Sequence, residues 1–313
     1  MALSGVTTLT VTRDQIITAA FEDMGIYAPG FETPSAQEVS SASLRLNMMI
    51  KAWQAAGVGL WLYQEIFLPF QAATKNYALG PSGTHCTASL GQTTTSVAAV
   101  SGASTITVTT VTGIVNGMFI GVELDGGSIQ WTTVNGAPVG SVVTLAAVLT
   151  GAAAAGNAVY FYSTKTARPI SIVEARVRTS SSVDTDLTVM SRNEYDSLSL
   201  KTATGKPTSY YYDPQMTNGV FYPWPLATEM SDIIVMTGRI PIQVFVNLSD
   251  NPHFPEEWFD ALHYSLALRL CAAYKVPPAQ EAAIKQMAIV TLQDARDFDR
   301  EQEVSLFFSP AFR

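Results

Sequence analysis

The sequence predicts an α+β protein, with a helical core, a β-subdomain and an inserted small all-β sandwich or barrel. Three observations predict this class. Apolar residues near both ends of the chain recur every three or four positions, which is typical of helices that bury one face. Residues 82–163 alternate instead with a period of two, between frequent glycine turns. That segment also contains only two charged residues, in contrast to both of its flanks.

The change in composition predicts the domain boundaries. Ser, Thr, Gly, Ala and Val predominate in residues 82–163, so we expect this segment to form an inserted all-β domain. Residues 1–81 and 164–303 are expected to form the core, which combines an N-terminal helical hairpin and two C-terminal helices with β-strands. Residues 304–313 are apolar and aromatic and are expected to form an extended C-terminal tail, which either folds back on its own domain or inserts into a neighbouring subunit.

Two capping boxes predict the N-terminal helical hairpin. Thr12 with Gln15, and Ser35 with Glu38, have the spacing at which two side chains satisfy the first turn of a helix. An apolar stripe follows each box, formed by Ile16, Ile17, Ala20, Phe21 and Met24 in the first helix and by Val39, Ala42, Leu46, Met49 and Trp53 in the second. Glycines after each stripe predict where the helices end.

Short β-branched and aromatic runs predict the strands of the β-subdomain. The chain enters a strand after Trp61, and Asn76–Leu79 and Pro169–Ile172 look like strand ends that the insert separates. Further strands are expected around residues 172–177, 219–222 and 233–236.

Strict alternation predicts the strands of the insert. Thr105–Thr109 and Gln130–Val134 are the clearest examples, and Glu123 and Asp125 are the two charged residues of this segment. Turns are expected at the recurring glycines Gly102, Gly117, Gly126, Gly127, Gly136 and Gly156.

Two prolines mark the starts of the C-terminal helices. Pro255 precedes Glu256 and Glu257, and acidic side chains are favourable in a first helical turn. A last helix follows Pro278, with its apolar stripe expected at Ile284, Met287, Thr291, Leu292, Ala295 and Phe298.

An aromatic segment between these regions has two interpretations. Tyr211, Tyr212, Tyr222 and Trp224 lie among prolines and are candidates for a subunit interface, because aromatic residues dominate buried contact patches. The alternative is a proline-framed β-hairpin that packs on the helices of its own chain.

The sequence offers little for catalysis or for binding a metal or cofactor. His85 beside Cys86 is too small a set of ligands for a metal site. His253 and His263 are expected to make helix-entry and packing contacts. The sequence lacks the HExxH, GxSxG and Walker A motifs, so we expect no enzyme, no cofactor and no metal.

Charge disfavours a specific nucleic-acid reader. The net charge is −8 and the pI is about 4.9, whereas such readers carry a basic face. We find no signal peptide and no apolar run long enough to anchor the chain in a membrane, so we expect synthesis in the cytoplasm.

Several segments together resemble a known family. Leu44–Gln54, followed by Gly57 and Leu60-Trp61, is similar to the N-terminal signature of the head-to-tail adaptor proteins of short-tailed bacteriophages, also called tail accessory or packaged-DNA-stabilisation proteins. The resemblance continues through Arg168-Pro169, Tyr211–Pro214, Tyr222–Pro225, Phe254–Leu262, Leu266–Leu270 and Tyr274. It covers the chain on both sides of the insert, in this order and spacing.

The resemblance implies a structural role in the virion, at the head–tail junction. Proteins of this family form a dodecameric ring beneath the portal, extend the DNA channel and seat the tail nozzle. The implied partners are the portal ring, the tail nozzle protein and further copies of the chain, while DNA passes through without specific binding. The family's C-terminal extension reaches the portal, which implies a portal-binding role for Leu306, Phe307, Phe308, Pro310, Phe312 and Arg313.

Two other functions stay open at this point. One is another tail component, a nozzle or decoration subunit whose β-insert binds a capsid or fibre partner. The other is a cell-wall hydrolase, which needs paired carboxylates. Its candidates Glu256, Glu257 and Asp260 lie at a helix start, where capping already explains them.

Overall fold

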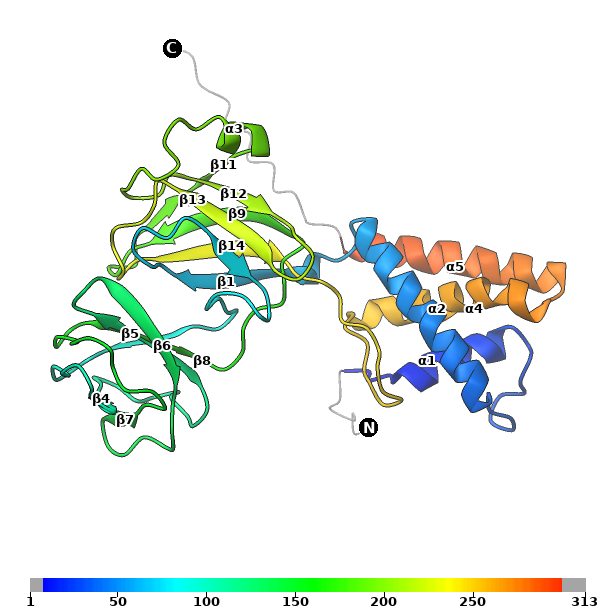
Figure 1. Ribbon diagram of the computed structural model, residues 1–313. Helices are drawn as coiled ribbons and strands as arrows, with labels where there is room; N and C mark the ends of the chain where they lie inside the picture. The colour runs from blue at the N-terminus through cyan, green and yellow to red at the C-terminus, as the bar shows by residue number, and fades with distance from the viewer. Residues whose placement is uncertain (1–7, 300–313) are drawn as a thin grey trace, which may run out of the picture. The chain divides into compact units, whose positions relative to one another are not determined.

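The computed structural model describes residues 8–299 and has a mixed α+β architecture, which confirms the expected class (Figure 1). The chain divides into two compact units. Unit 1 is Met1–Trp61 with Ile242–Arg313, and unit 2 is Leu62–Pro241. These bounds differ from the expected ones, since residues 62–81 and 164–241 group with residues 82–163 rather than with the helices. The boundaries of the insert stay a prediction.

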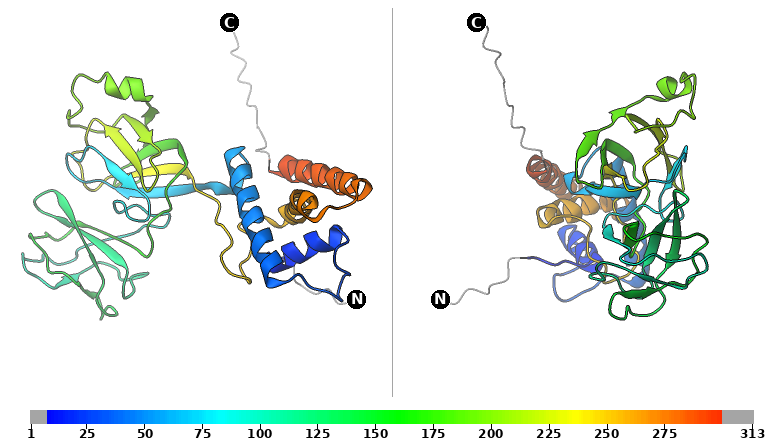
Figure 2. Two further views of the ribbon diagram at one scale, coloured as in Figure 1. Left: turned by 45° about the vertical axis from the view of Figure 1, so that its right-hand side comes forward. Right: turned by 90° about the vertical axis from the view of Figure 1, so that its left-hand side faces the viewer.

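Within residues 8–299, unit 1 contains four α-helices, one of which packs against the other three. They are α1 (Arg13–Asp23), α2 (Ala36–Ala55), α4 (Phe259–Tyr274) and α5 (Pro278–Phe298), with short 3-10 turns η1 (Leu60–Leu62) and η2 (Glu256–Trp258). Helix α4 contacts α1, α2 and α5, and it lies between α5 and α1 in the views of Figures 1 and 2. It is therefore apolar over much of its circumference, and eight of its residues are buried.

Local signals set the ends of the N-terminal helices. Both predicted capping boxes are present, Thr12 with Gln15 at α1 and Ser35 with Glu38 at α2. The predicted stripes face inward, except that Val39 is only half-buried. At the end of α2, Trp53 packs against the aromatic rings of Phe254 and Trp258.

The apolar stripe expected on α5 is partly wrong. Ile284 and Ala295 are buried as expected, but the buried residue between them is Ala288 rather than Met287. Met287 and Phe298 are exposed instead. Alanine at this position allows α5 to approach α4 closely, because its side chain is the smallest that still favours a helix.

Two four-stranded sheets of unit 2 share a core. The first has the order β1 (Tyr63–Pro69), β14 (Ile233–Arg239), β9 (Ser171–Arg178), β10 (Asp184–Asp186). The second has the order β11 (Thr188–Val189), β12 (Ser209–Asp213), β13 (Gly219–Trp224), β2 (Tyr77–Leu79), with the short helix α3 (Arg192–Asp196) between β11 and β12 in the chain. The strands expected around 172–177, 219–222 and 233–236 are confirmed.

Two expectations about this region need correction. The segments on either side of residues 82–163 do not continue one another, because β2 pairs with β13 whereas β9 pairs with β14. The aromatic hairpin β12–β13 packs on the first sheet rather than on the core helices, because Tyr210 and Phe221 alternate into the core that this sheet lines.

Residues 82–163 form small antiparallel sheets of their own. One has the order β3 (Gly91–Thr94), β8 (Ala158–Tyr162), β5 (Phe119–Leu124), β6 (Ser128–Thr133), and the other pairs β4 (Thr105–Thr107) with β7 (Val142–Thr144). They enclose a separate aliphatic cluster that includes Ile106, Ile120, Val143 and Val159. The turn glycines Gly102, Gly117, Gly127, Gly136 and Gly156 all have positive φ, as expected.

A second, smaller cluster joins these sheets to the rest of unit 2. Ile129 and Tyr160 pack against Ile233 and Val235 of β14. Neighbouring residues of β14 face the other core, so this strand is buried on both sides. The hydroxyl of Tyr160 also donates to the carbonyl of Met230, at 3.1 Å.

Candidate subunit-interaction surfaces

The predicted aromatic interface residues are half-buried and partly engaged within their own chain. Tyr211 and Tyr222 stack with ring centroids 5.7 Å apart, and Tyr195 of α3 stacks on Tyr211 at 5.5 Å. The hydroxyl of Tyr212 donates to the carbonyl of Pro169, and the indole of Trp224 donates to that of Leu200. These contacts explain the half-buried positions, and an interface role for the four residues stays a prediction.

The guanidinium of Arg192 lies over the Tyr211 ring, 5.9 Å from its centroid. The guanidinium of Arg192 donates to the Tyr211 hydroxyl at 2.9 Å and pairs with Asp213 at 2.8 Å. The sequence contained a signal for α3, because Ser191 and Glu194 form a third capping box that the sequence analysis missed.

The predicted tail residues Leu306, Phe307, Phe308, Pro310, Phe312 and Arg313 lie outside the described residues. Their portal-binding role stays a prediction.

Helix α2 carries a second apolar stripe on its outer side. Leu44 and Met48 are each 59% exposed, although they lie one turn apart in the middle of a well-formed helix. The inner stripe already fills the contact with α1 and α4, so these two side chains have no role in the core of unit 1.

An extended loop, residues 242–251, runs beside this stripe and is held by polar side chains of α2. The side-chain amide of Asn47 donates to the carbonyl of Phe245 at 2.9 Å and accepts from its N–H at 3.0 Å. The ammonium of Lys51 donates to the carbonyl of Ile242 at 2.5 Å, and the side chain of Gln54 accepts from its N–H. The loop thereby presents Val246 outward.

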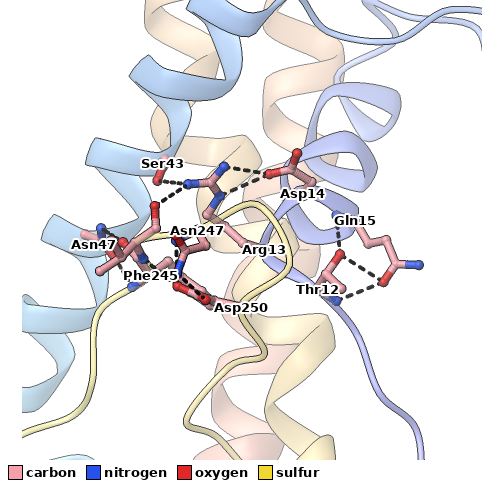
Figure 3. A network of polar contacts seen from close by, with 10 residues as sticks. Thr12, Arg13, Asp14, Gln15, Ser43, Asn47, Phe245, Asn247 and Asp250 are labelled. Atoms are coloured by element: carbon pink, nitrogen blue, oxygen red, sulfur yellow. Dashed lines mark hydrogen bonds and ion pairs between the residues drawn. The ribbon is translucent and has the colours of Figure 1, made fainter.

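A buried arginine anchors the other end of the loop, as Figure 3 shows. Arg13 pairs with Asp14 at 2.9 Å and also donates to Ser43 of α2 and to the carbonyl of Val246. Asp250 accepts from the N–H groups of Val246 and Asn247, both at 2.7 Å, which lowers its pKa. Backbone, amide and ion-pair contacts thus fix the loop against α1 and α2.

Helix and loop together border an open groove of about 920 Å³. Its lining includes Leu44, Asn47, Val246 and Leu248, with Arg13 among the more deeply placed residues. We call the exposed apolar side chains Leu44, Met48, Val246 and Leu248 the α2 patch. Leu44, Val246 and Leu248 line this groove, and Met48 lies one turn along α2 from Leu44.

Helix α5 carries a corresponding outer stripe, which we call the α5 seam. Its members are Ala283, Met287, Val290 and Phe298, and all four are exposed. They recur at steps of four, three and eight residues, so they lie along one side of the helix, and the exposed Asp294 lies on the same side between Val290 and Phe298. The buried stripe of Ile284, Ala288 and Ala295 runs alongside and packs toward α4.

The histidines make structural contacts. His85 stacks on Trp131 with ring centroids 4.0 Å apart, and its Nδ1 lies 2.6 Å from the Tyr162 hydroxyl. Burial, and secondarily Lys165, lowers the pKa of His85 to about 4. Burial raises the pKa of the neighbouring Cys86 thiol, which lies in the core shared by the two sheets. The His85 ring therefore lies in an aromatic stack, whereas the Cys86 thiol lies in the core between the two sheets.

The other two histidines lie in unit 1. His253 Nδ1 accepts from the backbone N–H of Gln243 at 3.3 Å, beside the loop. His263 bridges two carboxylates, with Nδ1 2.8 Å from Asp23 and Nε2 3.3 Å from Asp260. Within residues 8–299, the His, Cys, Asp and Glu side chains form no cluster of three or more that could hold a metal ion. No helix in the same range has the length and apolar character needed to cross a membrane.

Comparisons with models of known protein families and with curated proteins find no match for this chain.

Proposed function

We propose that this chain is a structural virion protein, a head-to-tail adaptor whose copies form a ring between the portal and the tail. The ring extends the DNA channel and seats the tail nozzle. The sequence resemblance suggests this role, and the proposal assigns no catalytic residue, metal or cofactor.

One structural observation carries the proposal. Unit 1 exposes two apolar surfaces, the α2 patch and the α5 seam, on helices whose inner stripes are already packed. Clustered apolar side chains on the outer side of a helix suit contact with another protein, and a ring requires such contacts. Heterologous contacts close into a ring only when each subunit offers two different surfaces.

The finer architecture belongs to the same proposal. Helices and β-strands from residues 1–81 and 164–303 form the adaptor core, and residues 82–163 form a domain inserted into it. The sheets and the aliphatic cluster confined to residues 82–163 support this division.

Net charge supports a passive channel for DNA. The chain has 18 basic and 26 acidic residues, so a ring of twelve copies is strongly negative. Binding to phosphates requires Lys and Arg, and an acidic lumen therefore allows DNA to slide.

Removing the tail tests the contact with the portal. Deletion of Val304–Arg313, outside the described residues, is expected to abolish binding to the portal ring and to leave the thermal unfolding of the remaining chain unchanged. The apolar side chains of this segment supply the contact energy. The measurement is sedimentation of the portal with full-length and truncated protein. Equal binding by the two would contradict a portal-binding tail.

A second candidate function is a nozzle or decoration subunit that acts through residues 82–163. The exposed valines Val97, Val100, Val139 and Val148 on this segment favour it, because a surface nearly free of charge suits contact with another protein.

A further inference from the structure

We propose that the α5 seam of one copy packs into the α2 patch and groove of the next copy, and that this contact repeats around the ring. The inference rests on the proposed function and names the partner surface within it: a second copy of this chain.

The two surfaces have complementary shapes. The α2 patch borders a groove of about 920 Å³, whereas the α5 seam is a ridge on a helix. Helices α2 and α5 have 20 and 21 residues, so each is about 30 Å long by the 1.5 Å rise per residue. A ridge on one helix seated in a groove beside another is the usual geometry of helix packing.

In the part of the chain that the structure describes, neither surface is covered by its own chain. Helix α4 packs between the inner stripes of α2 and α5, and the patch and the seam lie on outer sides of those helices. Within residues 8–299, each surface is therefore available to another molecule. A second copy supplies the partner surface, because its α2 patch contacts the α5 seam of the first copy. Its own α5 seam then stays available for the α2 patch of the following copy.

Charge favours this pairing over contact between two identical surfaces. Asp294 and Asp297 lie on the exposed side of α5 close to the seam. Lys51 lies one turn from Met48, while the charge of Arg13 is already balanced by Asp14. Seam against seam brings Asp294 of both copies together, whereas seam against patch places it opposite a surface where Arg13 is paired with Asp14 and the charge of Lys51 is offset by that of Asp250 of the loop.

Disulfide cross-linking between introduced cysteines tests this contact directly. Met48→Cys and Met287→Cys place one thiol on each surface, and the native Cys86 and Cys271 are buried, so they give little background. The double variant is expected to form a ladder of oxidised multimers. A mixture of the two single variants is expected to form mixed dimers, and each single variant alone is expected to stay monomeric. Dimers of one single variant with itself, or no cross-link at all, would overturn the inference.

A matched pair of charge variants tests the contact between copies separately from the adaptor function. Met287→Glu is expected to weaken self-association by about tenfold or more, because it removes an apolar contact and adds a second carboxylate to the side of α5 that already carries Asp294. Ile289→Glu is the control, since Ile289 is 58% exposed on the same helix but lies away from the seam. If the wild type forms a ring with the portal and Met287→Glu does so equally well, the contact is wrong and the adaptor function stands. If cross-links form but no portal complex does, the adaptor function fails.

Discussion

At the scale of single residues, Asn47 determines the form of the candidate groove. Its amide acts as donor and acceptor to the backbone of Phe245, much as a neighbouring strand would. Without it, two backbone groups of the loop lose their partners, and Lys51, Gln54 and Arg13 remain to hold the loop to the helices. The two hydrogen bonds of this one polar side chain therefore help to position the apolar surface beside α2.

Asn47→Ala is expected to lower the free energy of unfolding by about 1–2 kcal/mol, because it removes two hydrogen bonds of ordinary strength. Urea titration followed by circular dichroism measures the change. Ser41→Ala, at an exposed position on the same helix, is the control and should stay within about 0.5 kcal/mol of wild type. Equal stability of both variants would show that the amide does not hold the loop.

His263 links the stability of unit 1 to pH. Burial favours its neutral form, but the hydrogen bonds to Asp23 and Asp260 outweigh burial and raise the pKa of His263 above its ordinary value. The folded protein therefore holds this proton more tightly than the unfolded chain does. The stabilisation is complete below the unfolded pKa of about 6.5 and is lost as pH rises through the folded value.

His263→Gln is accordingly expected to destabilise unit 1 at acidic pH and to matter less as pH rises above the folded pKa. Thermal unfolding of wild type and variant across this range measures the difference. A destabilisation that is independent of pH would mean that the charged pair with Asp23 does not contribute.

At the scale of elements, α5 shows why two stripes on one helix are hard to tell apart in a sequence. Met287 and Ala288 are adjacent, and both fit an apolar pattern with steps of three and four. Contact with α4 selects Ala288 because a small side chain permits close approach, and this selection depends on a partner helix that periodicity does not reveal. Met287 is thereby left outside, where it forms part of the seam.

Ala288→Leu is expected to cost about 1–3 kcal/mol of stability, since a larger side chain overfills the contact with α4. Ala282→Leu, at an exposed position on the same helix, should be nearly neutral. Chemical unfolding of the two variants distinguishes them. If Ala282→Leu lowered the stability more than Ala288→Leu, the buried stripe of α5 would not include Ala288.

Elements that depend on neighbouring residues could be predicted, and those that depend on distant ones could not. The boxes at Thr12 and Ser35 fixed the starts of α1 and α2, and glycines marked the turns between β-strands. The pairing of β2 with β13 joins residues more than a hundred positions apart, which no local pattern encodes. The loop 242–251 was also missed, because its contacts with α2 come from single polar side chains.

At the scale of the whole molecule, the division into units separates two kinds of surface. Unit 1 combines the α2 patch, the α5 seam and the groove, whereas unit 2 holds the aromatic hairpin and the nearly uncharged sheets of residues 82–163. The candidate aromatic site was found from composition, because such residues are conspicuous in a sequence. The patch and the seam were not, because an exposed methionine or leucine looks like a core residue until the core is known.

The central claim is that copies of this chain form a ring on the portal. Size-exclusion chromatography with light scattering, on the protein alone and after mixing with the portal ring from the same source, tests it most directly. We predict a shift to one discrete mass equal to the portal plus a ring of twelve copies. A persistent monomer that does not bind the portal would contradict the account and favour residues 82–163 as a separate binding module.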